Sequence, residues 1–157
     1  MAVSYRPALF SDAEELDAGL RAADRDEVTA TSGTDTLKGI RRSILRSEEP
    51  VAAYDDLGLL CVFGTVDISG SYLSPVASPW FLGTDRISLY PRLLIADARR
   101  YVVALQRRFP LLVNYIDARN TTSMKWLNRL GFKLDSEPVP YGVAGLPFYR
   151  FERRANV

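Results

Sequence analysis

Histidine is absent from this 157-residue sequence, and cysteine occurs once. A chain without histidine cannot build the histidine-based zinc sites or the His-activated nucleophiles of many hydrolases, so we predict no metal site and no Cys–His chemistry. Cys61 lies in the apolar run 59–63 and has no partner for an internal disulfide. We therefore expect a buried structural thiol and a reducing compartment.

An excess of charge of one sign and a long hydrophobic run are also missing. Twenty basic residues face nineteen acidic ones, for a net charge of +1, which argues against a surface built to coat nucleic acid. No apolar stretch is long enough to cross a bilayer. The length and the ordinary 47% apolar and 25% charged content predict a single domain over residues 1–157, which we expect to be cytoplasmic.

The hydrophobic periodicity predicts alternating strands and helices along the whole chain. Strands are expected at residues 3–9, 51–54, 59–67, 80–82, 111–117, 132–134 and 148–151, and helices at 11–23, from a cap at Thr34 to before Pro50, at 89–109 and after Asn120. Residues 24–32 are expected to be a polar connection, and residues 68–79 and 139–147 are expected to be loops. The predicted order is β-α-α-β-β-β-α-β-α-β-β.

The stretch 120–132, NTTSMKWLNRLGF, is the most informative motif of the chain. Asn120 is a good N-cap, because its side-chain oxygen can accept a free backbone N–H of the first helical turn. Leu127 and Leu130 give the short helix one apolar face. Gly131 stands where helices often end in a left-handed residue, and Phe132 opens the next strand.

This motif resembles the last conserved helix of the GCN5-related N-acetyltransferases (the GNAT superfamily), and the element order also matches that family. The resemblance implies an α/β (α+β) fold with a mixed twisted sheet of about seven strands flanked by four helices. It further implies that the fourth and fifth strands splay apart to admit the pantetheine arm of acetyl-CoA. The implied activity is transfer of an acetyl group from acetyl-CoA to an amine of a small molecule or protein.

The resemblance also indicates cofactor-binding residues. The diphosphate cradle is expected between the fourth strand and the long helix, at Leu82, Gly83, Thr84, Arg86, Ile87 and Ser88, while Asn114, Asn120 and Ser123 would line the pantetheine site. This segment departs from the family pattern, because it holds a single glycine and carries Asp85 beside an expected anion. Two interpretations of this segment therefore remain: a phosphate-binding loop that diverges from the family pattern, or an ordinary strand-to-helix loop.

Catalysis requires a base for the amine and a proton for the leaving thiolate. Asp117 at the end of the fifth strand and Glu27 in the connection are the candidate bases, and Tyr115 is a candidate hydroxyl, each with a structural role as the alternative. Many GNAT enzymes carry a tyrosine seven residues after the helix-opening Asn. That position is Leu127 here, which has no proton to donate.

The chain is also similar to small GNAT-like proteins of T-odd-type tailed bacteriophages, some of them internal virion proteins. The segments 23–28, 79–85, 114–120 and 140–142 carry this likeness. It implies an alternative function: a catalytically degenerate protein that binds a host protein in the host cytoplasm or is packaged in the virion. Neither nucleic acid nor a membrane is an expected partner, and a homodimer is left open.

Overall fold

The computed structural model describes residues 2–156. The strands are β1 (Ser4–Pro7), β2 (Glu48–Asp55), β3 (Gly58–Asp67), β4 (Val76–Gly83), β5 (Leu111–Asp117), β6 (Lys133–Leu134), β7 (Val139–Tyr141) and β8 (Leu146–Arg154). The helices are α1 (Asp12–Gly19), α2 (Ala22–Ser32), α3 (Thr36–Arg46), the 3-10 helix η1 (Asp85–Leu89), α4 (Pro91–Leu105) and α5 (Thr121–Arg129).

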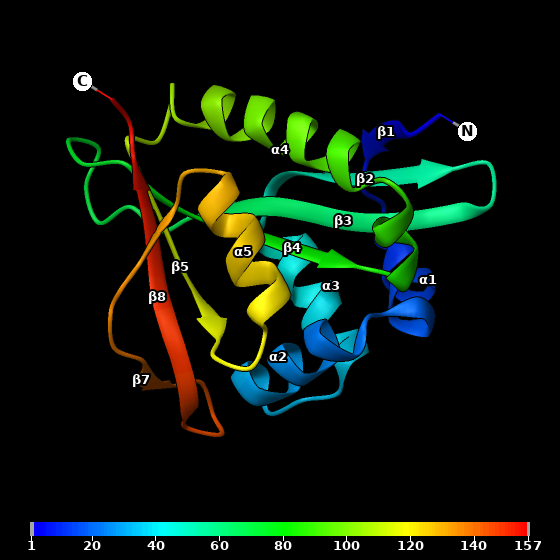
Figure 1. The fold of residues 1–157 in the computed structure, drawn as a ribbon, viewed down its shortest axis with the longest axis horizontal. Coiled ribbons are helices and arrows are strands. Elements are labelled where there is room, and N and C mark those ends of the chain that lie inside the picture. The colour runs from blue at the N-terminus through cyan, green and yellow to red at the C-terminus, as the bar shows by residue number, and fades with distance from the viewer. Residues whose placement is uncertain (1, 157) are drawn as a thin grey trace.

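One twisted sheet organises the molecule, in the strand order β1-β2-β3-β4-β5-β8-β6, with β7 paired to β8 (Figure 1). The pair β4–β5 is parallel and every other pair is antiparallel. Helix α4 makes the crossover between the two parallel strands. This mixed α/β architecture confirms the predicted fold class, and residues 2–156 hold eight strands and five α-helices where about seven and four were predicted.

The two faces of the sheet carry separate apolar cores, because successive side chains of a strand point to opposite faces. On β4, Leu82 packs with α1 and α3 in one core. Phe81, one residue earlier, packs instead with η1, α4 and α5 on the other face. A third core joins α4 and α5 to β5 and β8. Helices α1–α3 therefore cover one face, and α4 and α5 cover the other.

The local signals around Asn120 are confirmed. The Asn120 side chain accepts a hydrogen bond from Ser123 N and caps α5, and Gly131 adopts a φ of 85° after the helix ends. Pro91 stands in the first turn of α4, where a missing N–H costs no hydrogen bond. Cys61 is buried, and burial raises the pKa of its thiol to about 12, which fits the expected structural role.

The prediction for residues 24–32 is wrong, because they belong to α2. The first helix stops at Gly19, and extended Leu20 makes an antiparallel bridge to Thr84. The chain then re-enters a helix through Ala22 and Ala23, which are strong helix formers. Strand β4 also starts earlier than predicted, at Val76, and β7 forms inside the segment expected to be a loop.

Candidate active site

Strands β4 and β5 share only the base of their common edge. Their pairing consists of Val76 with Leu111 and Ala77 with Leu112. Beyond these pairs, residues 78–83 of β4 and 113–117 of β5 continue as strands without pairing to each other, and the ribbons diverge (Figure 1). We call this unpaired stretch the split. The sheet is therefore open between two strands that are both fully paired on their other sides.

A split exposes backbone groups that an ordinary ladder would satisfy. On β4, Thr84 N donates to Leu60 O of β3. Alternate residues of a strand direct their N–H and C=O groups to opposite edges. The C=O of Pro79, and both groups of Phe81 and Gly83, therefore point into the split. The backbone groups of Pro79 and Gly83 that face the split are hydrogen-bonded to side chains or to the backbone of the α1–α2 connection.

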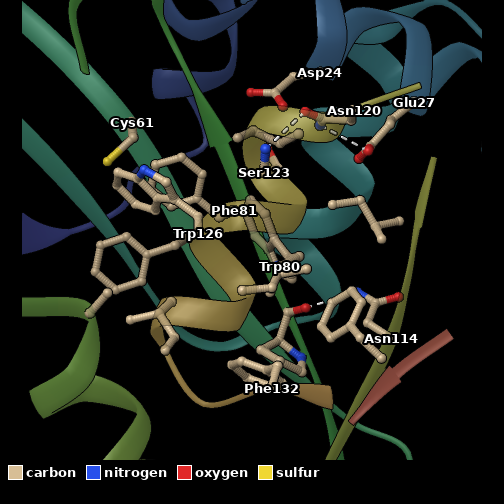
Figure 2. A pocket seen from close by; sticks show the side chains of 18 of the residues that line it. Asp24, Glu27, Cys61, Trp80, Phe81, Asn114, Asn120, Ser123, Trp126 and Phe132 are labelled. Atoms are coloured by element: carbon tan, nitrogen blue, oxygen red, sulfur yellow. Dashed lines mark hydrogen bonds between the residues drawn. The ribbon is translucent and has the colours of Figure 1, made fainter. Parts of the chain in front are cut away.

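Asn114 bridges the two strands at the base of the split. Its Nδ2 donates to Pro79 O over 2.8 Å, and its Oδ1 accepts from Tyr115 N over 2.8 Å (Figure 2). One amide side chain thus satisfies a carbonyl of β4 and an N–H of β5. This explains why a polar residue interrupts the apolar strand: it replaces the ladder bonds at the point where the ladder stops.

The tip of β4 is held by the start of α2. Gly83 N donates to Asp24 Oδ2 over 2.8 Å, and Gly83 O accepts from Arg21 N over 3.0 Å. Asp24 is only 2% exposed, and the Arg21 guanidinium binds both of its oxygens, at 2.7 and 2.9 Å. This buried pair fixes the end of β4 away from β5.

Glu27 performs the same role for β5. Its Oε1 accepts from Asp117 N at 3.1 Å and from Asn120 Nδ2 at 3.0 Å. Its other oxygen, Oε2, has no hydrogen-bond partner within residues 2–156. Burial raises the pKa of Glu27 to about 7, against the lowering effect of the Asn120 hydrogen bond, and the nearby Asp24 charge raises it further. A carboxyl group with this pKa exchanges protons readily near neutral pH.

Phe81 is the exception among the β4 residues that face the split. Its N–H and C=O point into the split by the strand alternation, and no side chain of residues 2–156 bonds to either group. One backbone donor and one backbone acceptor are therefore free at mid-height in the opening. Such a pair can bind an amide or a carbonyl of a ligand that runs along the strand.

A cavity of about 610 Å³ occupies the split and passes through the sheet. From the α4 and α5 side it is lined by Leu94, Ala98, Ser123 and Trp126, and from the α2 and α3 side by Glu27, Val28, Thr31 and Ser43. The Trp126 ring lies 5.8 Å from the Phe81 ring, centroid to centroid. Figure 2 shows Glu27, Asn120 and Asp24 gathered at one end of the cavity and Asn114 at the other.

The structure brings most of the predicted site residues to this cavity. Glu27, Leu82, Ile87, Asn114, Tyr115, Asn120 and Ser123 line it, whereas Gly83, Thr84, Arg86, Ser88 and Asp117 are not among its lining residues. The Tyr115 ring stacks on Tyr141 with centroids 4.1 Å apart and an angle of 13° between the rings. Leu127 packs in the core between α5 and β5.

The segment predicted to cradle phosphates is largely occupied by internal contacts. Arg86 forms an ion pair with Asp55, and Tyr90 Oη donates to the same carboxylate over 2.8 Å. The Arg86 hydrogen bond, followed by that of Tyr90, lowers the pKa of Asp55 to about 2. Ser88 Oγ donates to Asp85 O in its own turn. Arg86 therefore anchors η1 to the β2–β3 turn, and its expected role toward phosphate does not fit this contact.

The geometry also argues against Asp117 as a base. Both of its oxygens accept hydrogen bonds from the Arg119 guanidinium, which hold the pKa of Asp117 below its ordinary value, and Oδ1 also accepts from Arg119 N. A carboxylate with these partners has little tendency to take up a proton. Of the two carboxylates expected from the sequence, Glu27 alone combines a free oxygen with a raised pKa.

The sequence analysis named Glu27 but placed it in a connection, and so missed the helical face of α2 that borders the cavity. Asp24, Glu27, Val28 and Thr31 recur at intervals of three, one and three residues, which is the spacing of one helical face. This helical spacing is present in the sequence, but two of the four side chains are acidic, so apolar periodicity does not reveal it. Tyr141, in the unexpected strand β7, also lines the cavity.

Residues 2–156 contain no cluster of three or more His, Cys, Asp or Glu side chains placed to hold a metal ion. Within the same residues, no helix has both the length and the apolar content needed to cross a membrane.

The start of α4 has open backbone donors. Leu94 N is the first N–H to bond back into the helix, to Tyr90 O, so the N–H groups of Arg92 and Leu93 have no intrahelical acceptor.

Comparison with known proteins identifies the fold. No family model and no curated protein sequence matches the chain. Among solved structures, a GNAT-family acetyltransferase from Streptococcus pneumoniae matches with a TM-score of 0.66 at 13% identity, over 99% of this chain and 100% of that one. A GNAT-superfamily phosphinothricin acetyltransferase from Sinorhizobium meliloti, in complex with acetyl-CoA, matches with a TM-score of 0.68 at 14% identity, over 99% and 90%.

A third structure is spermidine N-acetyltransferase from Vibrio cholerae in complex with CoA and spermine, with a TM-score of 0.67 at 11% identity over 97% of this chain and 95% of that one. None of the three is a phage protein, so they lend no support to the phage likeness. At these identities the similarity defines the architecture. The chain has the fold of the GNAT acetyltransferases.

Proposed function

We propose that this protein is an N-acetyltransferase that moves an acetyl group from acetyl-CoA to an amine. One observation carries the proposal: the split is lined on one strand by the free N–H and C=O of Phe81 and closed at its far end by Glu27, whose pKa is raised to about 7. The free backbone groups that could bind the cofactor and the carboxyl group that could act as the base thus lie in the same cavity.

The residues present fit the pantetheine arm of acetyl-CoA better than its diphosphate. The arm carries amides and a thioester carbonyl, which Phe81 N–H and C=O can bind while Ala98 and Ser123 form the apolar and small walls beside it. Leu82, Ile87, Asn114 and Asn120 complete this proposed binding set. When bound, acetyl-CoA supplies an activated acetyl thioester.

For the diphosphate we propose the start of α4 in place of the Arg86 side chain. The N–H groups of Arg92 and Leu93 are open at that helix end, and helix N-termini favour anions. The Arg92 side chain is exposed and has no acidic partner in the part of the chain that the structure describes. Gly83 and Thr84 support this end by fixing the tip of β4.

In the proposed mechanism, Glu27 Oε2 takes the proton from the acceptor ammonium, so that the neutral amine can attack. Oε1 keeps the carboxylate in place through Asn120 and the amide of Asp117. Phe81 N–H is directed where negative charge develops on a carbonyl oxygen held in the split. Leu127 has no proton to donate, so protonation of the departing thiolate is left to water.

Thermal unfolding with acetyl-CoA tests the binding half of the proposal. Acetyl-CoA at millimolar concentration should raise the melting temperature, because it binds the folded state only. Ala98→Phe, which fills the groove between α4 and α5, should abolish the shift. Val103→Phe, on the exposed side of the same helix, is the matched control and should retain it. No shift for the unmodified protein would contradict the proposal.

The alternative is a binding protein of this fold that has lost catalysis. Two observations favour it: Leu127 replaces the expected tyrosine, and Arg86 is engaged by Asp55. A thermal shift with acetyl-CoA, combined with no turnover on a broad amine panel, would select this alternative. The phage setting, a host-protein partner, packaging in a virion, a homodimer and a cytoplasmic location stay predictions from the sequence.

A further inference from the structure

A second, smaller cavity adjoins the split on the side of the sheet covered by α3. Its volume is about 270 Å³, and Asn114, Tyr115 and Tyr141 line both cavities. The two spaces therefore share a wall made of the stacked tyrosines. A molecule that presents its amine to Glu27 could extend its other end past this wall into the smaller cavity.

The lining of the smaller cavity combines apolar walls, two neutral polar side chains and one cation. Val66 of β3, Ile68 just after that strand and Val113 of β5 supply the apolar walls, and Ser78 and Asn114 are the neutral polar residues. Arg46, at the end of α3, is the sole charged side chain that lines it. Arg46 has no acidic partner and no side-chain hydrogen bond within residues 2–156. An unpaired guanidinium beside a space walled by aliphatic and tyrosine side chains suits a carboxylate, which it can bind through two parallel hydrogen bonds.

We infer that the acceptor of the proposed reaction is a small amino carboxylate whose amine and carboxylate lie at opposite ends of an apolar body, with the carboxylate bound by Arg46. This inference rests on the proposed function. The positive charge of Arg46 also works against acceptors that carry a second ammonium group, because like charges placed together disfavour the wrong ligand. Polyamines should therefore be poor acceptors.

Matched acceptor pairs test the inference through turnover. The carboxylates ε-aminocaproate and para-aminomethylbenzoate, whose amine and carboxylate lie at opposite ends, are compared with their decarboxylated amines, pentylamine and benzylamine, with spermidine as the polyamine. The carboxylates should be preferred, and Arg46→Gln should raise their KM about ten- to a hundredfold, as expected for loss of charge-assisted hydrogen bonds. The same variant should leave the KM of the decarboxylated amines unchanged. Arg42→Gln, an exposed arginine one turn earlier on α3, should alter neither.

Equilibrium binding gives a second test that needs no turnover. The N-acetyl derivatives of ε-aminocaproate and para-aminomethylbenzoate are titrated into the CoA-saturated protein beside their uncharged primary amides. Binding of the carboxylates that is stronger than binding of the amides, and that is lost in Arg46→Gln, supports the inference. Equal binding of both forms, absence of carboxylate binding at millimolar concentration, or a preference for the decarboxylated amines or spermidine overturns it.

These outcomes separate the inference from the function on which it rests. If acetyl-CoA shifts the melting temperature but Arg46→Gln has no selective effect on carboxylates, the acceptor assignment is wrong and the proposed function stands. If acetyl-CoA gives no shift, the proposed function itself fails. N-acetyl carboxylates can also be titrated into the protein without CoA, so the assignment of Arg46 is decided by its own measurement.

Discussion

The two edges of strand β4 differ sharply. Along β3, β4 is paired in continuous register from Ala77 with Asp67 to Gly83 with Cys61. Along β5, pairing stops at Ala77. Beyond it, side chains and the α1–α2 connection bind the backbone groups of Pro79 and Gly83, while those of Phe81 stay free. The same strand is thus an ordinary ladder on one side and one wall of a cavity on the other. The comparison teaches that a sheet can be held open by polar side chains placed where ladder bonds would be.

The largest expected effect is on turnover, and it comes from removing the proposed base, Glu27, at the edge of the sheet that is open between β4 and β5. Glu27→Gln keeps an oxygen for Asp117 N and Asn120 but cannot take up a proton. Turnover should fall by about 10²–10⁴, the usual contribution of general base catalysis. The thermal shift with acetyl-CoA should persist. The exposed neighbour Asp26→Asn is the control, and equal losses in both variants would remove Glu27 from the mechanism.

Asp24→Ala should produce the largest loss of stability. It leaves Gly83 N–H without its acceptor and the Arg21 guanidinium, whose side chain is 16% exposed, without its partner. Breaking a buried pair in this way costs roughly 3 kcal/mol of unfolding free energy. Urea unfolding measures the change. Asp26→Ala on the same helix is exposed and should change stability by less than about 0.5 kcal/mol.

Asn114→Ala should have a smaller effect. It leaves Pro79 C=O and Tyr115 N–H unpaired at the base of the split, which costs about 1–3 kcal/mol when buried polar groups lose their partners. Acetyl-CoA should also bind more weakly, because the strand positions are no longer fixed. Asn128→Ala, on the exposed side of α5, serves as the comparison in the same unfolding experiment. A stable Asn114→Ala protein with unchanged cofactor binding would show that the amide bridge does not hold the strands.

A further effect concerns the pH dependence of stability. The folded-state pKa of Glu27, about 7, lies above its ordinary value of 4.5, so the folded state binds the proton more tightly than the unfolded chain. Ionisation of Glu27 therefore removes stability as pH rises between these values. Glu27→Gln lacks this loss, and its stability relative to the unmodified protein should increase from pH 4.5 to pH 7. A difference that is flat with pH would contradict the raised pKa.

Much of the fold could be predicted because its signals are local. The capping Asn120, the left-handed Gly131 and the apolar periodicity of α4 each act within a few residues, and all three are confirmed. Helix α2 was missed because its inner face is polar and meets a cavity, so Asp24 and Glu27 gave no apolar stripe.

The roles of the candidate carboxylates could not be assigned from sequence, because they depend on partners far along the chain. Glu27 has its pKa raised by burial beneath β5, ninety residues away, and Arg86 is captured by Asp55 of the β2–β3 hairpin. Asp117, in contrast, is neutralised by Arg119, two residues away, a pairing the local sequence does allow. Which of two acids remains available is a tertiary property.

Amide hydrogen exchange at Phe81, followed by NMR, tests most directly whether β4 and β5 stand apart to receive a ligand. Leu82, whose amide the alternation directs to β3, is the internal reference. Without ligand, the Phe81 amide should exchange faster than that of Leu82, and saturating acetyl-CoA should slow it about tenfold or more, as a new hydrogen bond requires. Equal protection of both amides in the free protein, or no change at Phe81 on adding acetyl-CoA, would contradict the account.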